Sequence, residues 1–131
     1  MKKPIEEWKT ILPDHVFNIL WKQETEPPFT GELVDEKRHG IYCCAGCGNQ
    51  LFSSSAKFDS GSGWPSFIEP MSSKSISTRI DDSFGMSRVE VICASCGGHL
   101  GHVFDDGPNP LGKRYCINSA ALTFIKQTSI L

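Results

Sequence analysis

The sequence predicts a mainly β fold, a small sandwich or barrel with short helices at its N-terminus. Helical periodicity is confined to the first part of the chain, up to about residue 22. From residue 40 onward, short β-type runs alternate with Gly, Ser, Pro and Asp, which indicates many short strands joined by turns. A length of 131 residues also suits one domain. We therefore expect residues 1–131 to form a single domain.

Residues 1–39 are expected to form helices and a loop that wrap the rest of the domain. Pro4 suits a first helical turn. The apolar side chains that follow at helical spacing are Ile5, Trp8, Ile11 and Leu12. Pro13 and Asp14 interrupt this pattern, and a second short helix is expected after them. The turn-rich segment 24–40 predicts a loop around the domain.

Residues 40–126 are expected to form the β core. The candidate strands span residues 40–43, 51–52, 75–80, 87–93, 101–104, 114–117 and 121–126. The segment 86–93 alternates most regularly, which favours an antiparallel strand with two different faces.

Composition and charge exclude several classes of function. The chain has 13 basic and 15 acidic side chains, whereas nucleic-acid-binding proteins usually carry a basic excess. No apolar run approaches the roughly 20 residues that span a bilayer. The lysines at the start are not followed by the apolar segment of a secretory signal. We expect a cytoplasmic monomer without nucleic-acid or membrane partners.

Four of the six cysteines form two matching knuckles. Cys44 and Cys47 are one CxxC pair, Cys93 and Cys96 are the other, and a glycine follows each pair. Two intervening residues let a tight turn present both sulfurs to one ion, and the glycine permits a positive φ. Four thiolates complete the tetrahedral shell of a structural zinc ion and leave no open position for catalysis. We therefore predict one structural zinc ion that closes a long loop and stabilises the fold.

Two alternatives to this zinc site stay open. One of the CxxC pairs could be redox-active, although thioredoxin-type motifs lack a matching second knuckle. Cys43 could replace Cys44, although its spacing to Cys47 is one residue too long for a symmetric site.

Cys116 is the candidate nucleophile. In an alternating strand Arg114, Cys116 and Asn118 share one face. A cation favours the thiolate, and an amide can fix the orientation of a partner. The alternative is a buried cysteine that acts as a small hydrophobic residue.

His99 and His102 follow directly after the second knuckle, so a bound metal would hold the start of their segment rigidly. Histidine is the side chain best suited to exchange a proton near neutral pH. If His102 faces Cys116, the pair supplies a thiolate and a proton donor. Zinc ligation by these histidines is disfavoured because four cysteines already fill the shell. Asp105 and Asp106 are interpreted as turn residues.

Trp64 follows a flexible loop of glycines and serines at residues 59–63. An indole beside a reactive thiol would form a pocket for a methyl or thioether group. A core tryptophan after a turn is the alternative.

These motifs together resemble the B-type peptide-methionine (R)-S-oxide reductases over nearly the whole chain. The matching segments are EEWK, TEPPFTG, the two CxxC knuckles, KFDSGSGWPSF, GGHLGHVFDDGP and GKRYCINSAAL. The resemblance implies two small antiparallel sheets with short helices and a structural zinc ion. It implies that Cys116 is the catalytic cysteine and that His99 and His102 are active-site histidines. Trp64 would line the methyl pocket, with Phe67 from the same segment, and Arg114 and Asn118 would belong to the same site.

The implied reaction is the reduction of protein-bound methionine-R-sulfoxide, a repair of oxidative damage. Cys116 would attack the sulfoxide sulfur, His102 would protonate the oxygen, and Cys116 would remain as a sulfenic acid. Thioredoxin or another external thiol would then reduce it.

One position departs from a common pattern of the resembled family. Many relatives carry a resolving cysteine two residues before the tryptophan, and here that position is Ser62. Either Cys43 replaces it, or an external thiol attacks the sulfenic acid directly. We favour the external thiol, because Cys43 abuts a predicted zinc ligand in a predicted strand.

Two other functions compete with the reductase. A zinc-ribbon module could grip RNA, DNA or protein, but the slightly acidic balance argues against nucleic acid. A zinc-dependent hydrolase using His99 and His102 would require one knuckle not to bind the metal.

Overall fold

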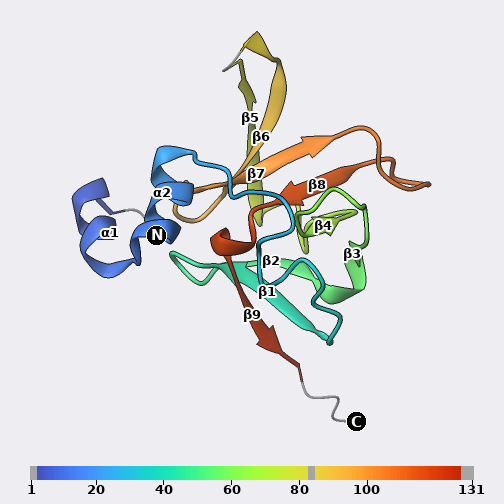
Figure 1. Cartoon of the computed structure of the whole chain (residues 1–131), viewed down its shortest axis with the longest axis horizontal. Coiled ribbons are helices and arrows are strands. Elements are labelled where there is room, and N and C mark those ends of the chain that lie inside the picture. The colour runs from blue at the N-terminus through green and yellow to red at the C-terminus, as the bar shows by residue number, and fades with distance from the viewer. Residues whose placement is uncertain (1–2, 83–84, 128–131) are drawn as a thin grey trace.

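The computed structural model describes residues 3–82 and 85–127, so residues 1–2, 83–84 and 128–131 of the predicted domain lie outside the described residues. Helix α1 spans Ile5–Ile11 and α2 spans Asp14–Lys22, which confirms the predicted pair (Figure 1). Pro4 and Pro13 each stand directly before a helix, where the missing N–H is not needed. No helix in the described part of the chain is long and apolar enough to cross a membrane.

Within the described ranges the rest of the chain forms two antiparallel sheets, as predicted. The smaller sheet has the order β2-β1-β9. Its strands are β1 (Gly40–Cys44), β2 (Gln50–Ser53) and β9 (Leu122–Lys126). The short helix η1 (Ser54–Ala56) follows β2, and η3 (Ser119–Ala121) leads into β9.

The larger sheet has the order β3-β4-β8-β7-β6-β5. Its strands are β3 (Lys57–Phe58), β4 (Ser66–Phe67), β5 (Ile76–Asp81), β6 (Arg88–Cys93), β7 (His99–Phe104) and β8 (Arg114–Ile117). In Figure 1 the β5–β6 hairpin projects at the top and the β7–β8 hairpin reaches to the right. Strands β3 and β4 were not predicted, because two residues are too few to show an alternating pattern.

Aromatic side chains from both sheets form the centre of the core. Phe52 of β2 stacks on Phe67 of β4 with ring centroids 4.3 Å apart, and Tyr42 of β1 meets Phe67 edge-on at 5.1 Å. Burial raises the pKa of Tyr42 to about 12. Leu20 of α2 is also buried in this core, so the predicted apolar helix face covers the sheets. The two sheets are therefore held together by direct packing.

Candidate active site and metal centre

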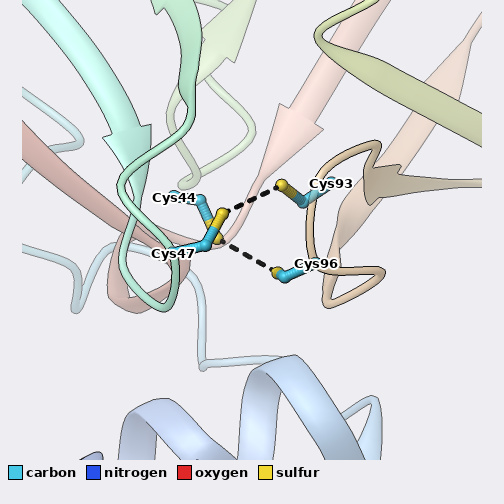
Figure 2. A group of neighbouring side chains, drawn as sticks. All are labelled: Cys44, Cys47, Cys93 and Cys96. Carbon is cyan, nitrogen blue, oxygen red and sulfur yellow. Dashed lines mark hydrogen bonds between the residues drawn. The ribbon is translucent and has the colours of Figure 1, made fainter. Parts of the chain in front are cut away.

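The four knuckle cysteines lie close together, where a turn of the smaller sheet approaches a turn of the larger sheet (Figure 2). Cys44 ends β1 and Cys47 lies in the turn after it, and Cys93 ends β6 with Cys96 in the following turn. All four sulfurs lie within 4.8 Å of one another. The cluster therefore links the smaller sheet to the larger one.

The sulfur geometry fits one tetrahedral metal ion. The Sγ atoms of Cys44 and Cys96 are 3.7 Å apart, and those of Cys47 and Cys93 are 3.6 Å apart. Metal–sulfur bonds of about 2.3 Å in a tetrahedron place sulfurs about 3.8 Å apart. These four residues could hold a metal ion, as the paired spacing predicts.

Donors around the cluster favour thiolates. The Gly98 amide donates to Cys96 Sγ at 3.4 Å, and Asn49 Nδ2 lies 3.7 Å from Cys93 Sγ. Such contacts support and orient metal-bound sulfurs. The glycine after each knuckle has the predicted positive φ, +80° at Gly48 and +84° at Gly97.

Polar side chains on neighbouring strands of the larger sheet form a row, in which each residue is the cross-strand partner of the next. Cys116 of β8 is paired with His102 of β7 on one side and with Ser66 of β4 on the other. His102 is paired in turn with Glu90 of β6. Directly opposed residues in antiparallel strands point to the same face of the sheet. The strand pairing therefore brings the predicted thiol and the predicted proton donor together.

Gly101 allows β8 to approach β7 closely beside this row. A Cβ at this position would collide with the carbonyl oxygen of Cys116 and the backbone of Ile117. The glycine of HLGHVF is therefore required by backbone contact, and any side chain there would displace Cys116.

The Cys116 thiol is half-buried, and this burial dominates its ionisation. Desolvation raises the pKa of Cys116 above the ordinary value, although Ser62 and Arg114 act in the opposite direction. Ser62 Oγ lies 3.9 Å from Cys116 Sγ. The predicted cation is therefore present beside the thiol, but it does not offset the cost of burial.

Arg114 is fixed by two neighbours. Its Nε and Nη2 donate to the carboxylate oxygens of Asp106 at 2.8 and 3.1 Å, and its guanidinium stacks over the Phe104 ring at 4.5 Å. The hydrogen bond with Asp106 raises the pKa of Arg114. Asp106, interpreted from the sequence as a turn residue, thus also orients a cation at the site.

His102 contacts a carboxylate that the sequence did not reveal. Its Nε2 lies 2.8 Å from Oδ2 of Asp81, which is also 3.4 Å from Arg88 Nη2. A carboxylate at this distance forms a hydrogen bond that orients the imidazole ring. The contact leaves Nδ1 of His102 as the nitrogen that can serve a substrate.

His99 lies beside His102 because β7 carries an irregularity in register. Val91 pairs with Gly101 but Ile92 pairs with His99, so β7 has one additional residue at this point. The two imidazole rings meet edge-on with centroids 5.4 Å apart. In a regular strand, residues three apart would point to opposite faces.

A buried carboxylate holds His99 from behind. Glu90 Oε2 lies 2.6 Å from His99 Nδ1, and Glu90 Oε1 accepts from Arg79 Nε at 2.5 Å. Burial alone would raise the pKa of Glu90, but the hydrogen bonds from Arg79 and His99 hold it below the ordinary value. Desolvation lowers the pKa of His99 despite Glu90. Burial of His99 therefore outweighs its contact with Glu90 and disfavours its charged form.

A cavity of about 240 Å³ opens over this row. Its lining residues are Thr25, Ser62, Trp64, Arg88, Gly101, His102, Phe104, Arg114, Cys116 and Asn118. It brings together the sequence-predicted Cys116, His102, Trp64, Arg114 and Asn118. Such a cavity accepts a side chain of methionine size, with the indole as its apolar wall.

Comparison with known proteins identifies the family of this chain. A SelR domain matches residues 12–126. The peptide methionine sulfoxide reductase MsrB of Methanosarcina mazei is 50% identical over 127 residues, which are 97% of this chain and 91% of the relative. The chain belongs to the MsrB family.

Other MsrB proteins match to a similar extent. That of Bradyrhizobium diazoefficiens is 55% identical over 120 residues, 92% of this chain and 86% of the relative. That of Leptospira interrogans is 50% identical over 127 residues, 97% of both chains. The matched region runs from α2 to β9 and includes both the cysteine cluster and the cavity. The resemblance inferred from the motifs is confirmed.

Two sequence-predicted residues of this MsrB chain do not line the cavity. Phe67 is fully buried between Phe52 and Tyr42, so its ring belongs to the core and not to the expected substrate contact. His99 is 2% exposed and lies behind His102. His99 therefore contacts His102 but does not line the cavity.

Cys43 of this MsrB chain is buried in β1, paired with Thr123 of β9 and Gln50 of β2. Burial raises the pKa of the Cys43 thiol. Ser62, by contrast, lines the cavity beside Cys116.

Proposed function

We propose that this protein reduces the R epimer of methionine sulfoxide in oxidised proteins, with Cys116 as the nucleophile. The observation that carries the proposal is the pairing of Cys116 with His102 in a cavity walled by the Trp64 indole. Membership of the MsrB family supports the substrate class. We infer R-selectivity and repair of oxidative damage from the resemblance of the motifs to the B-type reductases.

The proposed reaction moves one oxygen atom between two sulfurs. The Cys116 thiolate attacks the sulfoxide sulfur and forms a bond to it, and the sulfoxide oxygen takes a proton. The S–O bond then breaks as the hydroxyl passes to Cys116, and the electron pair of the S–S bond returns to the methionine sulfur. Methionine is reduced by two electrons, and Cys116 is oxidised to a sulfenic acid.

His102 supplies the proton in this proposal. Asp81 at Nε2 stabilises the protonated ring, and Nδ1 delivers the proton to the oxygen. His99 and Arg114 hold the imidazole and the thiol in place, and Asn118 shapes the wall.

External thiols regenerate Cys116. A first thiol displaces water from the sulfenic acid and forms a mixed disulfide, and a second thiol attacks that disulfide and releases Cys116. The position of the usual resolving cysteine is Ser62, and Cys43 is buried in the other sheet. Thioredoxin, or another dithiol, is the proposed reductant.

Zinc is the proposed metal of the four-cysteine cluster, because soft thiolates in a tetrahedral set suit it. When bound, it supplies structural stability and takes no part in the transfer of oxygen. Cysteines that bind a metal or react as thiols also suit a reducing compartment, for which we propose the cytoplasm. We propose that the protein acts as a monomer.

The proposal is tested with a short peptide that contains methionine sulfoxide as separated R and S epimers. Wild-type protein with a dithiol reductant is expected to reduce the R epimer and to spare the S epimer. Cys116→Ser is expected to lose this activity, and Cys43→Ser is the matched control that retains it. Activity in Cys116→Ser, or reduction of the S epimer alone, would contradict the proposal.

A further inference from the structure

Glu26 contacts two residues of the cavity wall although it lies in an irregular segment. Residues 23–33, here named the strap, form the first part of the connection from α2 to β1. The Glu26 carbonyl accepts from Trp64 Nε1 at 2.9 Å. Its amide donates to Asn118 Oδ1 at 3.1 Å. One backbone unit thus fixes the indole and the amide that line the cavity.

The Glu26 carboxylate fixes that backbone unit in turn. Its two oxygens accept from the backbone amides of Ser119 at 2.7 Å and Ala120 at 3.0 Å. These amides begin the short helix η3, directly after Asn118. Hydrogen bonds to a carboxylate are about twice as strong as those between neutral groups. The side chain therefore ties the strap to the segment that follows the nucleophile.

Other contacts hold the strap on both sides of Glu26. The Phe29 amide donates to the Gly63 carbonyl at 2.7 Å, beside Trp64. The Leu33 amide donates to Ser119 Oγ at 2.9 Å. Thr25 itself lines the cavity. The strap is thus part of the cavity wall and not only a connection between elements.

We propose that Glu26 is a positioning residue that sets the Trp64 indole and the Asn118 amide in the cavity wall. The proposal rests on the proposed reduction of methionine sulfoxide, because these walls would hold the methyl group and the backbone of that substrate. Without the carboxylate, the strap loses its attachment at Ser119 and Ala120. The indole then loses its fixed partner, the Asn118 amide is held only through the Leu100 carbonyl at 3.0 Å, and substrate binding weakens.

The kinetic test compares Glu26→Ala with Glu24→Ala. Glu24 is an exposed carboxylate of the same strap, and its side chain makes no hydrogen bond or ion pair within residues 3–82 and 85–127. We expect kcat/KM for the R-sulfoxide peptide to fall by about 10-fold to 100-fold in Glu26→Ala, mainly through KM. Glu24→Ala should stay within about twofold of the wild type, as is usual for exposed sites. Glu26→Gln keeps the length and one acceptor oxygen, so it should recover part of the loss.

A second measurement does not depend on catalysis. Acrylamide quenching of Trp64 fluorescence, taken as the difference from Trp64→Phe in each background, should increase in Glu26→Ala and stay unchanged in Glu24→Ala. This subtraction removes the signals of Trp8 and Trp21. If the wild type proves unable to reduce the peptide, the proposed function fails, and the quenching still decides whether Glu26 positions the indole.

The kinetic effects of Glu26→Ala and Trp64→Phe should also be less than additive, since both act on the same wall. All variants are compared at a temperature at which circular dichroism shows them folded. A Glu26→Ala protein that melts earlier but keeps the wild-type KM and the wild-type quenching would overturn the proposal and leave Glu26 a purely structural residue.

Discussion

His102 of β7 is the direct cross-strand partner of Cys116 of β8. Opposed residues in an antiparallel pair have Cβ atoms about 5 Å apart on one face of the sheet. The acid and the nucleophile of the proposed reaction are therefore placed by hydrogen-bonded strands, which hold geometry better than a loop would. Because the pairing fixes both side chains, the proposed reaction should also depend on the residues that contact His102 and Cys116.

Loss of the His102 ring, or of the Asp81 carboxylate that contacts it, should slow the chemical step. We expect His102→Gln to lower kcat by about 100-fold or more, because general acid catalysis contributes at least that much. Asp81→Asn should lower kcat less strongly, because the ring stays but its protonated form loses a partner. Asp82→Asn, an exposed neighbour, is the control. Equal kcat values for Asp81→Asn and Asp82→Asn would show that Asp81 does not support the acid.

The reactivity of Cys116 should depend on pH as a raised pKa requires. Only the thiolate is alkylated, so the raised pKa leaves less of it near neutral pH than in a free cysteine, whose pKa is about 8.5. The rate of iodoacetamide labelling of Cys116, followed by mass spectrometry of its peptide, should still rise with pH above the pKa of a free cysteine. Ser62→Ala should shift the profile to still higher pH, since it removes a contact that lowers the pKa. A profile centred below the free-cysteine value would contradict this assignment.

Ser62→Cys should restore an intramolecular disulfide. The Ser62 oxygen is 3.9 Å from Cys116 Sγ, within reach of a sulfur–sulfur bond of about 2 Å after a small rotation. One turnover without reductant should produce a 62–116 disulfide that peptide mass mapping detects, whereas the wild type should hold a sulfenic acid trapped by dimedone. Ser60→Cys is the neighbouring control.

Loss of one metal ligand should unfold the protein. Cys93→Ser is expected to release zinc and to abolish cooperative thermal unfolding, because ligand binding and folding are coupled in such sites. Cys43→Ser, a buried cysteine outside the cluster, should keep about one zinc per chain. Elemental analysis and calorimetry measure both properties. A folded Cys93→Ser protein with full metal content would refute the assigned ligand set.

Glu90→Gln should destabilise the fold by about 2 kcal/mol, because Arg79 and His99 lose a buried, charged hydrogen-bond acceptor. The pKa of Glu90 is lower in the folded state, so the unfolded chain binds the proton more readily. Its contribution is therefore complete above about pH 4.3 and is lost as the pH falls through the lower native value. Urea unfolding of both proteins across this range gives the difference, which should shrink on acidification. If the difference in unfolding free energy did not change with pH, the charge of Glu90 would not be what stabilises the fold.

Much of this molecule could be predicted from local patterns. Pro4 and Pro13 marked the helix starts, and alternation placed Arg114 and Cys116 on one strand face. The paired CxxC spacing predicted the metal cluster, because both halves of the site are local turns. These features depend on residues that are close in sequence.

The features that sequence reasoning missed depend on distant contacts. Asp81 reaches His102 across 21 positions, and Glu26 reaches Ser119 across 93. No periodicity signals such pairs, although Glu26 stands in the TEPPFTG segment that supported the family resemblance. The additional residue in β7, which turns His99 toward His102, also leaves no mark in the alternation.

The sulfur cluster sets a limit on how long this protein can work under peroxide. Cys44, Cys93 and Cys96 are sealed from solvent, but Cys47 is only half-buried and is the sulfur that an oxidant meets first. Over-oxidation there would remove one of the four proposed metal ligands and weaken the link between the sheets at the cluster, whereas the sulfenic acid proposed for Cys116 is reduced by thiols. We therefore expect the resistance of the proposed enzyme to peroxide to depend on Cys47, a residue that takes no part in the proposed reaction.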